Sequence, residues 1–433
     1  MNNRTVITDW RQPFELHESS GGEPNMQWFH PTILRKQRWA LVICLFVLHF
    51  LSSVAQAQDF KVRPVARAEV DIAPDGYVFT SISSHSINDS GQIAFTALTS
   101  LVVPGLFLFD RAELLQIAGH GDPAPGGGNF GLFSFASLNQ EGHIAFSVDL
   151  IGGEQGVFLF DGSKMIAIAR SSEAPTGCGP FRALVGPSLN DNGQIAFVGR
   201  VPAGYGTFLF DGKQVVKVAC PGEPAPGGGT FVRTLWCSMN NAGQVVLEAF
   251  LSSPPGATGI FLYEQGELFA VARDGDPAPW GGSFGPMSSP MINNAGQVGF
   301  HSGGPAGGMI VLEGGKFRRI LPYTDPDTGE VFRIFLPRGG RWHPFYLNDA
   351  GQIVFEGQQI PPGEDFRNGM FFFDGSGFRA IVYAGDLMPD PRGVRFRNFY
   401  SLALNNAAQV SFVSDGYPRI DDNSLFIAVP AAH

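Results

Sequence analysis

The side chains best suited to hold a ligand are arginines and aromatic residues placed irregularly in an otherwise regular chain. An arginine binds a carboxylate through two parallel hydrogen bonds, and an aromatic ring stacks on the apolar face of a sugar. We therefore predict a ligand-binding site built from several inner strands, with the contact residues Arg182, Arg233, Trp236, Arg341, Trp342, His343, Tyr346, Arg397 and Tyr400. The alternative is ordinary packing around a channel, with the arginine head groups in water.

A second set of candidates is acidic and recurs regularly. One carboxylate occurs near the same place in each Gly/Pro-rich loop: Asp71, Asp122, Glu173, Glu223, Asp276, Asp325 and Asp386. Arranged in a ring, these carboxylates would focus negative potential on one face and attract a cation, with structural Ca²⁺ as the candidate. The alternative is that Asp or Glu before Pro caps a turn and recurs only because the loop recurs.

Catalytic chemistry has little support in the motifs. The sequence holds no His-Glu-x-x-His and no phosphate-binding loop, and the histidines after residue 57 show no metal-ligand spacing. We therefore predict no catalytic residues and, apart from the Ca²⁺ candidate, no cofactor.

The elements that position these residues come from a motif that occurs seven times. A clear copy is the octet Asn190–Phe197 (NDNGQIAF), and the copies begin at Asn88, Asn139, Asn190, Asn240, Asn293, Asn348 and Asn405, 50 to 57 residues apart. Each repeat predicts four strands: a Phe-initiated strand, the strand that begins in the octet, an aromatic strand and a Val/Ile/Ala strand. A Gly/Pro loop, such as residues 121–128, joins one repeat to the next.

Each strand boundary has a local cause. Asn-Asp-Asn-Gly and Asp-Gly between strands predict hairpin turns, because Asn, Asp and Gly adopt turn dihedrals at little cost. Gln-Ile-Ala-Phe alternates in the manner of a half-buried strand. Pro and successive Gly exclude regular structure from the loops. In the sixth repeat, residues 322–337 replace the Gly/Pro loop, and we expect an unusual loop there.

Seven repeats of four antiparallel strands predict an all-β fold, a seven-bladed β-propeller in a single domain over residues 58–433. Residues 61–67 match a fourth strand that belongs to no repeat, and residues 424–429 match the third strand of a repeat that lacks a fourth. We therefore expect the N- and C-terminal strands to share one blade, which removes the free sheet edges. The 56 Gly, 32 Pro and 39 Phe favour short strands and tight turns over helices.

The recurrent Asn-x-x-Gly-x-x-Ala-Phe, with Phe-Leu-Phe-Asp-Gly, resembles the secreted bacterial tandem-repeat proteins known by their NxxGxxAF repeats, a choice-of-anchor family. The resemblance covers about residues 60–430 and implies no established activity. Some members carry a C-terminal surface anchor, which we do not expect here because Val429–His433 has no apolar tail. The fourth and seventh copies depart from the motif, with Leu247 in place of the final Phe and Ala408 in place of Gly.

Residues 1–57 are predicted to be an N-terminal extension and a secretory signal peptide. The basic cluster 35–38 precedes an apolar run of 13 residues, 39–51, and Ala55-Gln56-Ala57 predicts cleavage before Gln58. An uncleaved anchor is the alternative, although a membrane span needs ~20 apolar residues. The true start is open between Met1 and Met26. We expect a secreted or periplasmic protein with no membrane span in the mature chain.

The charge of the mature chain is unfavourable for binding nucleic acid or anionic membranes. The chain has 29 Lys/Arg and 39 Asp/Glu, of which residues 1–57 hold five and four. The remaining 24 basic and 35 acidic residues give a net charge of −11 without basic runs. Three cysteines remain. Cys178 and Cys220 lie at the same kind of loop, so we prefer this disulfide over a pair with Cys237.

These features predict an exported, non-catalytic propeller that binds a glycan, a peptide or another cell-envelope partner on the face of the Gly/Pro loops, and we expect a monomer. The alternative is a propeller enzyme, such as a metal-assisted hydrolase, a lactonase or a polysaccharide lyase, with its site at the channel mouth. An enzyme would gather His, acid and Arg around one point, whereas a binding module would show a polar and aromatic patch.

Overall fold

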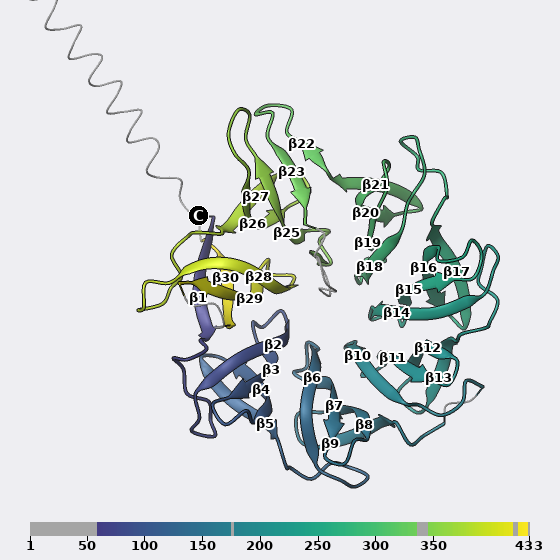
Figure 1. Cartoon of the computed structure of the whole chain (residues 1–433), viewed down its shortest axis with the longest axis vertical. Helices are drawn as coiled ribbons and strands as arrows, with labels where there is room; N and C mark the ends of the chain where they lie inside the picture. The colour runs from purple at the N-terminus through teal and green to yellow at the C-terminus, as the bar shows by residue number, and fades with distance from the viewer. Residues whose placement is uncertain (1–58, 175–176, 336–344, 419–422, 432–433) are drawn as a thin grey trace, which may run out of the picture. The chain divides into compact units, whose positions relative to one another are not determined.

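The computed structural model describes residues 59–174, 177–335, 345–418 and 423–431. These residues form 30 β-strands and no helix, arranged as seven sheets around a central channel (Figure 1). The predicted seven-bladed β-propeller is confirmed. The part of the chain described by the structure contains no helix that could cross a membrane.

The blades are numbered in chain order, and each strand is hydrogen-bonded to the next from the channel outward. Blade 1 comprises β2 (Phe79–Ile87), β3 (Ile93–Thr99), β4 (Pro104–Asp110) and β5 (Glu113–Gly119), and blade 2 comprises β6 (Phe130–Leu138), β7 (Ile144–Leu150), β8 (Gln155–Phe160) and β9 (Met165–Arg170). Blade 3 comprises β10 (Ala183–Leu189), β11 (Ile195–Val201), β12 (Gly204–Phe210) and β13 (Val215–Ala219), and blade 4 comprises β14 (Phe231–Met239), β15 (Val245–Leu251), β16 (Thr258–Glu264) and β17 (Glu267–Arg273). Blade 5 comprises β18 (Met287–Ile292), β19 (Val298–Ser302), β20 (Gly308–Glu313) and β21 (Lys316–Leu321). All pairings within these blades are antiparallel.

Blade 7 joins the two ends of the propeller. Its strands run in the order β28 (Arg395–Leu404), β29 (Val410–Tyr417), β30 (Ser424–Pro430) and β1 (Phe60–Ala66). The first strand therefore pairs with the last, from Phe60 opposite Pro430 to Ala66 opposite Leu425. The expected shared blade is confirmed, and it pairs an edge of β30 that would otherwise be exposed.

Blade 6 has a short hairpin in the segment where the sequence predicts an unusual loop. Residues in that segment form a hairpin of β22 (Tyr323–Thr324) and β23 (Val331–Ile334), which adds to β24 (Phe345–Leu347), β25 (Ile353–Ile360), β26 (Arg367–Phe373) and β27 (Phe378–Tyr383). Strands β23 and β24 pair with successive parts of the same long strand, β25. Stacking of Phe332 on Phe378, with ring centroids 4.7 Å apart, anchors the hairpin to the outer strand.

Phenylalanine fills the interior of each blade, which explains its abundance. In blade 3, Phe181, Phe197 of the octet and Phe208 of the aromatic strand are all buried, and the Phe181 and Phe208 centroids lie 4.8 Å apart. Burial of each ring contributes about 1.5–3 kcal/mol. The glycine of Gly-x-Phe makes room for the ring, since a Cβ on Gly105 would lie 2.7 Å from Cζ of Phe107.

The octets hold neighbouring blades together at one end of the channel, which we call the octet end. The first Asn of each octet is buried, and its Nδ2 donates to the backbone carbonyl of the first Asn in the next blade, as from Asn190 to Asn240 at 3.1 Å. The last such bond, from Asn405 to Asn88 at 2.8 Å, closes the circle. Seven bonds complete it.

A second circle of hydrogen bonds runs beside the first. The backbone N–H of the second octet residue donates to the side-chain oxygen of its counterpart in the next blade, over 2.7–3.0 Å. These residues are Asp89, Gln140, Asp191, Asn241, Asn294, Asp349 and Asn406. The octet is therefore a hairpin turn, as predicted, and also the contact between blades.

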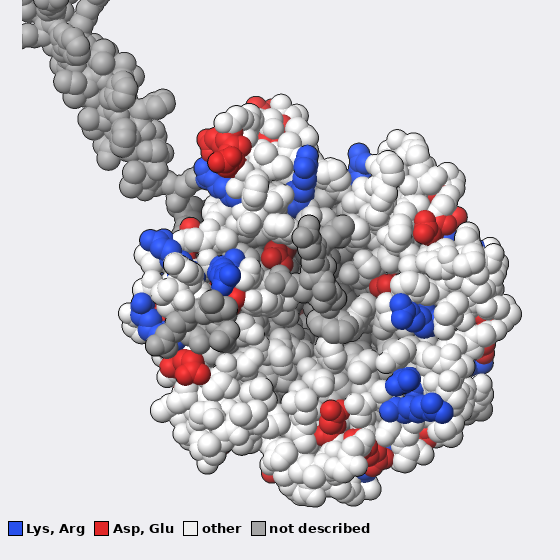
Figure 2. Space-filling model, in the orientation of Figure 1, with Lys and Arg blue, Asp and Glu red and all other residues white. Residues whose placement is uncertain are grey.

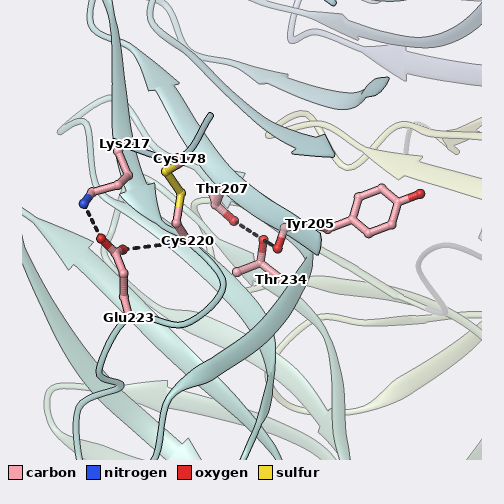
Figure 3. The surroundings of a disulfide bond; sticks show 7 residues. All are labelled: Cys178, Tyr205, Thr207, Lys217, Cys220, Glu223 and Thr234. Atoms are coloured by element: carbon pink, nitrogen blue, oxygen red, sulfur yellow. Dashed lines mark hydrogen bonds and ion pairs between the residues drawn. A yellow bond between two sulfur atoms is a disulfide. The ribbon is translucent and has the colours of Figure 1, made fainter. Parts of the chain in front are cut away.

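The preferred disulfide is confirmed. Cys178, in the loop before β10, bonds to Cys220, which directly follows β13, and the two Cα atoms are 6.3 Å apart (Figure 3). Glu223 lies beside this bond, accepts the N–H of Cys220 at 3.0 Å and pairs with Lys217. Cys237 is free and buried in β14. The disulfide thus ties the loop before the inner strand of blade 3 to the end of its outer strand.

Candidate ligand-binding channel

A cavity of about 710 Å³ lies in the central channel. It is lined by the inner strand of every blade, β2, β6, β10, β14, β18, β24 and β28. The repeats contribute unlike residues to this wall, whereas a second cavity of about 160 Å³ at the octet end is lined by the uniform octet residues. The central cavity is therefore the place where the symmetry of the chain is broken.

Serine hydroxyls form one side of the wall. Five serines accept a backbone N–H from the inner strand of the following blade, over 3.0–3.4 Å: Ser84, Ser86, Ser137, Ser188 and Ser238. Because each hydroxyl oxygen acts here as an acceptor, its own proton can be donated to a ligand oxygen. In blades 5, 6 and 7 the place of Ser86 is taken by Met291, Tyr346 and Ala403. The wall is thus hydroxyl-rich on one side and more apolar on the other.

An aromatic platform, composed of Phe135 and Trp236, crosses the hydroxyl-rich side. The rings come from blades 2 and 4, and their centroids lie 6.0 Å apart at an interplanar angle of 65°. Between them, Gly186 of blade 3 has φ +63°, and a Cβ there would lie 3.4 Å from Cζ3 of Trp236. The small residue therefore leaves space for two rings from non-adjacent blades to meet.

Two tyrosines complete the lining. Burial raises the pKa of Tyr346 to about 12, so its hydroxyl stays protonated at neutral pH. The Tyr400 hydroxyl donates to Oδ2 of Asp415 at 2.6 Å, and Asp415 is 1% exposed and also accepts the N–H of Asn398 at 2.8 Å. These bonds fix the orientation of the Tyr400 ring in the wall.

The structure brings together the aromatic part of the predicted site. Trp236, Tyr346 and Tyr400 line the cavity. Arg182, Arg233 and Arg397 are exposed at the beginning of inner strands, outside the lining. The remaining candidates, Arg341, Trp342 and His343, lie outside the described residues. The described arginines of the predicted site are thus exposed, as in the alternative in which their head groups are in water.

The acidic residues of the Gly/Pro loops cap turns. In blade 1, Oδ2 of Asp122 accepts the N–H of Gly119 at 2.7 Å, and Asp71, Glu173, Glu223, Asp276 and Asp386 make the equivalent bond. Asp325 instead accepts the N–H groups of Asp327 and Thr328. This is the geometry of the turn-capping alternative. Within the described residues, no three His, Cys, Asp or Glu side chains are grouped as metal ligands.

Several titratable groups are buried between blades. Burial raises the pKa of Glu248 to about 7, opposed by the N–H of Ser289, which donates to it at 3.2 Å, and by Arg233. Burial lowers the pKa of His301 to about 4 and that of His85, which lines the cavity, to about 4 as well. Both histidines are therefore neutral at pH 7.

Sequence reasoning missed Phe135 and the serines. The serines had a visible signal, since a serine stands two residues before the first Asn of the octet in each of the first four repeats. One further stretch, Gly281–Gly285, matches Gly-x-Ser-x-Gly, the pattern of a hydrolase nucleophile. Its Ser283 lies in the loop between β17 and β18, bridged to Pro277, without the helix that such a nucleophile requires.

Fold and channel together define a seven-bladed propeller whose variable residues line one central cavity. The chain belongs to a family of unknown function (DUF7453), whose model matches residues 51–309. Among curated proteins, none matches the sequence.

Similar solved structures share little sequence identity with this chain. The propeller domain of the Trilobed protease from Pyrococcus furiosus is 10% identical, with 81% of this chain and 94% of that chain covered and a TM-score of 0.49. The acylaminoacyl peptidase of Pyrococcus horikoshii is 11% identical, with 80% of this chain and 51% of that chain covered and a TM-score of 0.47. Aleuria aurantia lectin with Fucα1-6GlcNAc is 11% identical, with 70% and 95% covered and a TM-score of 0.36.

Proposed function

We propose that this protein is an exported, non-catalytic propeller that binds a glycan in its central channel. The observation that carries the proposal is the aromatic platform of Phe135 and Trp236 beside an arc of serine hydroxyls in one cavity of about 710 Å³. Sugars have C–H faces that stack on aromatic rings, and oxygens that accept hydrogen bonds. The aromatic rings and the serine hydroxyls of the wall therefore both suit a glycan.

A peptide fits the same wall less well. Extended peptides bind by adding a strand, which needs free backbone N–H groups on a sheet edge. Here the N–H groups of Ala136, Leu138, Leu189, Met239 and Ile292 on the inner strands already donate to serines of the preceding blade. The channel edge therefore has fewer donors for a peptide backbone.

A glycan array tests the proposal, followed by titration calorimetry with the strongest ligand. We expect Trp236→Ala to weaken binding at least tenfold, because truncating a buried aromatic contact costs about 2 kcal/mol or more. The control is Phe269→Ala, which removes a 46% exposed ring from the outer strand of blade 4 and should leave affinity unchanged. Wild-type affinity in the Trp236 variant, or binding of peptides alone, would contradict the proposal.

A propeller enzyme remains the second candidate because of Glu248. Glu248 lies outside the cavity lining, but it accepts the N–H of Ser289 on the inner strand β18, and burial raises its pKa to about 7, where a carboxyl can accept or donate a proton. Its test is the release of new reducing ends or unsaturated sugars from glycans that bind. Turnover that disappears in Glu248→Gln while binding persists would favour the enzyme over the binding protein.

Export is the remaining part of the proposal. The Cys178–Cys220 disulfide supports an oxidising compartment, and the resemblance to secreted NxxGxxAF proteins points the same way. Mass spectrometry of the exported protein should find Gln58 at its N-terminus. Retention of residues 1–57 in a cytosolic fraction would overturn this part.

A further inference from the structure

Three exposed arginines lie at or beside the beginning of the inner strands of blades 3 and 4, and we call them the arginine rim. Arg182 directly precedes β10, Arg200 lies near the end of β11, and Arg233 is the third residue of β14; all three are exposed. We propose that this arginine rim binds the carboxylates of a uronic-acid glycan whose adjoining sugars lie on the aromatic platform. The inference rests on the proposed glycan binding and names the class of glycan.

The three residues lie on neighbouring strands of blades 3 and 4. The backbone N–H of Arg182 donates to the carbonyl of Arg200 at 2.7 Å, and Arg200 is opposite Ala183 in the strand register, so both arginines lie where β10 begins. Arg233 occupies the place in β14 that Leu132 occupies in β6, and Leu132 lines the cavity. The Arg233 guanidinium carbon lies 4.3 Å from the centroid of the Phe250 ring, which supports the side chain at the rim.

The positive charge of the rim has no partner among the described residues. Some other arginines are paired with an acid, as in Arg67–Asp71, Arg170–Glu154 and Arg379–Asp374, but among the described residues no ion pair involves a member of the rim. Glu248 is an acid that interacts electrostatically with Arg233, and burial favours its neutral form. The rim therefore has no evident role in stability.

The rim and the platform suit one extended ligand. Arg233 is three residues before Trp236 on the same strand, which corresponds to about 10 Å. Figure 2 shows sparse charge on the face it draws; Lys and Arg lie beside β14 and over the blade of β10–β13, and also over the blades of β22–β27 and β28–β30. Guanidinium groups bind carboxylates through paired, charge-assisted hydrogen bonds. An oligosaccharide with regularly spaced carboxylates could contact both features.

The test uses residues 58–433 and three probes of equal length: a galacturonic acid hexamer, the same hexamer with its carboxyls reduced, and a sulfated galactose hexamer. The test variant is Arg182→Gln/Arg200→Gln/Arg233→Gln. The matched control removes the same charge from three exposed lysines that are not on inner strands, as Lys61→Gln/Lys164→Gln/Lys213→Gln. Calorimetry at low and high salt gives the affinities.

We expect the uronate hexamer to bind at least tenfold more tightly than the reduced hexamer and to weaken with salt. The arginine variant should lose at least tenfold in affinity for the uronate alone, whereas the lysine variant should bind as the wild type does. Equal binding of the reduced hexamer, or an unaffected arginine variant, would overturn the rim and leave the glycan proposal standing. Tighter binding of the sulfated hexamer would overturn the uronate assignment. If no hexamer binds, the rim inference fails, and the glycan array decides the wider proposal separately.

Discussion

Single side chains set the properties of the channel wall and its surroundings, and burial of the Glu248 carboxyl makes stability depend on pH. It is 4% exposed, with the Ser289 N–H as its hydrogen-bond donor. Burial raises its pKa from 4.5 to about 7. Between pH 4.5 and 7 the folded protein therefore keeps a proton on the Glu248 carboxyl, whereas the unfolded chain releases it. Its unfolding free energy should fall as pH rises from 4.5 to 7 and change no further above.

Glu248→Gln should remove this pH dependence. Gln keeps an acceptor for the Ser289 N–H but has no charge to bury. We expect the variant to match the wild type near pH 4.5 and to exceed it by up to about 3 kcal/mol above pH 7. Denaturant unfolding at the two pH values measures the difference. Equal stability of the two proteins at pH 8 would show that the carboxyl is not destabilised in the fold.

Site residues that interrupt the repeat pattern could be predicted from the sequence. Trp236 lies where the first, third, fifth and seventh repeats have serine or glycine, Tyr346 where the first four have serine, and Tyr400 where three others have serine, and all three line the cavity. Phe135 stands at the same place in its repeat as Trp236, but its type did not mark it, because phenylalanine also fills every blade interior. Its meeting with Trp236 depends on space at Gly186, a contact between three blades that no local pattern encodes.

At the scale of elements, the octet circle joins the blades. Each buried Asn satisfies the N–H groups of its own turn and the carbonyl of the next turn, so the turns also fix how neighbouring blades meet. The hairpins were predictable because Asn, Asp and Gly act locally. The circle was not, since its bonds join residues about 50 positions apart. The β22–β23 hairpin was missed for the same reason, because its anchor, Phe378, lies far along the chain.

Asn139→Ala should destabilise the protein strongly. Asn139 donates to the Asn190 carbonyl at 3.2 Å and accepts the N–H of His143 at 2.9 Å. Its loss leaves buried polar groups unsatisfied, which costs about 1–3 kcal/mol for each group. The control in the same octet is Glu141→Ala, whose exposed side chain should matter by less than about 0.5 kcal/mol. Thermal unfolding compares the two, and similar melting temperatures would argue against the circle.

At the scale of the whole molecule, stability depends on closure of the ring by β1. This strand adds Phe60, whose ring lies 5.3 Å from that of Phe372 in blade 6, and covers the edge of β30. Unmatched strands at both ends of the sequence predicted this closure. Pairing of β1 with β30 thus closes the seven repeats into one ring.

A chain that begins at Arg67 and so lacks β1 should fail to stay monomeric. The edge of β30 would be free to pair with another copy, so we expect oligomers in size-exclusion chromatography and a lower melting temperature. The reference is a chain that begins at Gln58, which should fold and remain monomeric. Two chains that behave alike would contradict a role for closure.

The central claim is that the ligand occupies the channel beside Trp236. The chain from residue 58 onward contains three tryptophans, so 5-fluorotryptophan labelling gives three ¹⁹F resonances, assigned by single Trp→Phe variants. Trp280 is an internal reference, since it lies in the loop between β17 and β18, where its N–H donates to the Ala306 carbonyl at 3.0 Å. We predict that a glycan selected by the array shifts the Trp236 resonance and leaves that of Trp280 in place. A glycan that binds without moving the Trp236 resonance would contradict the account.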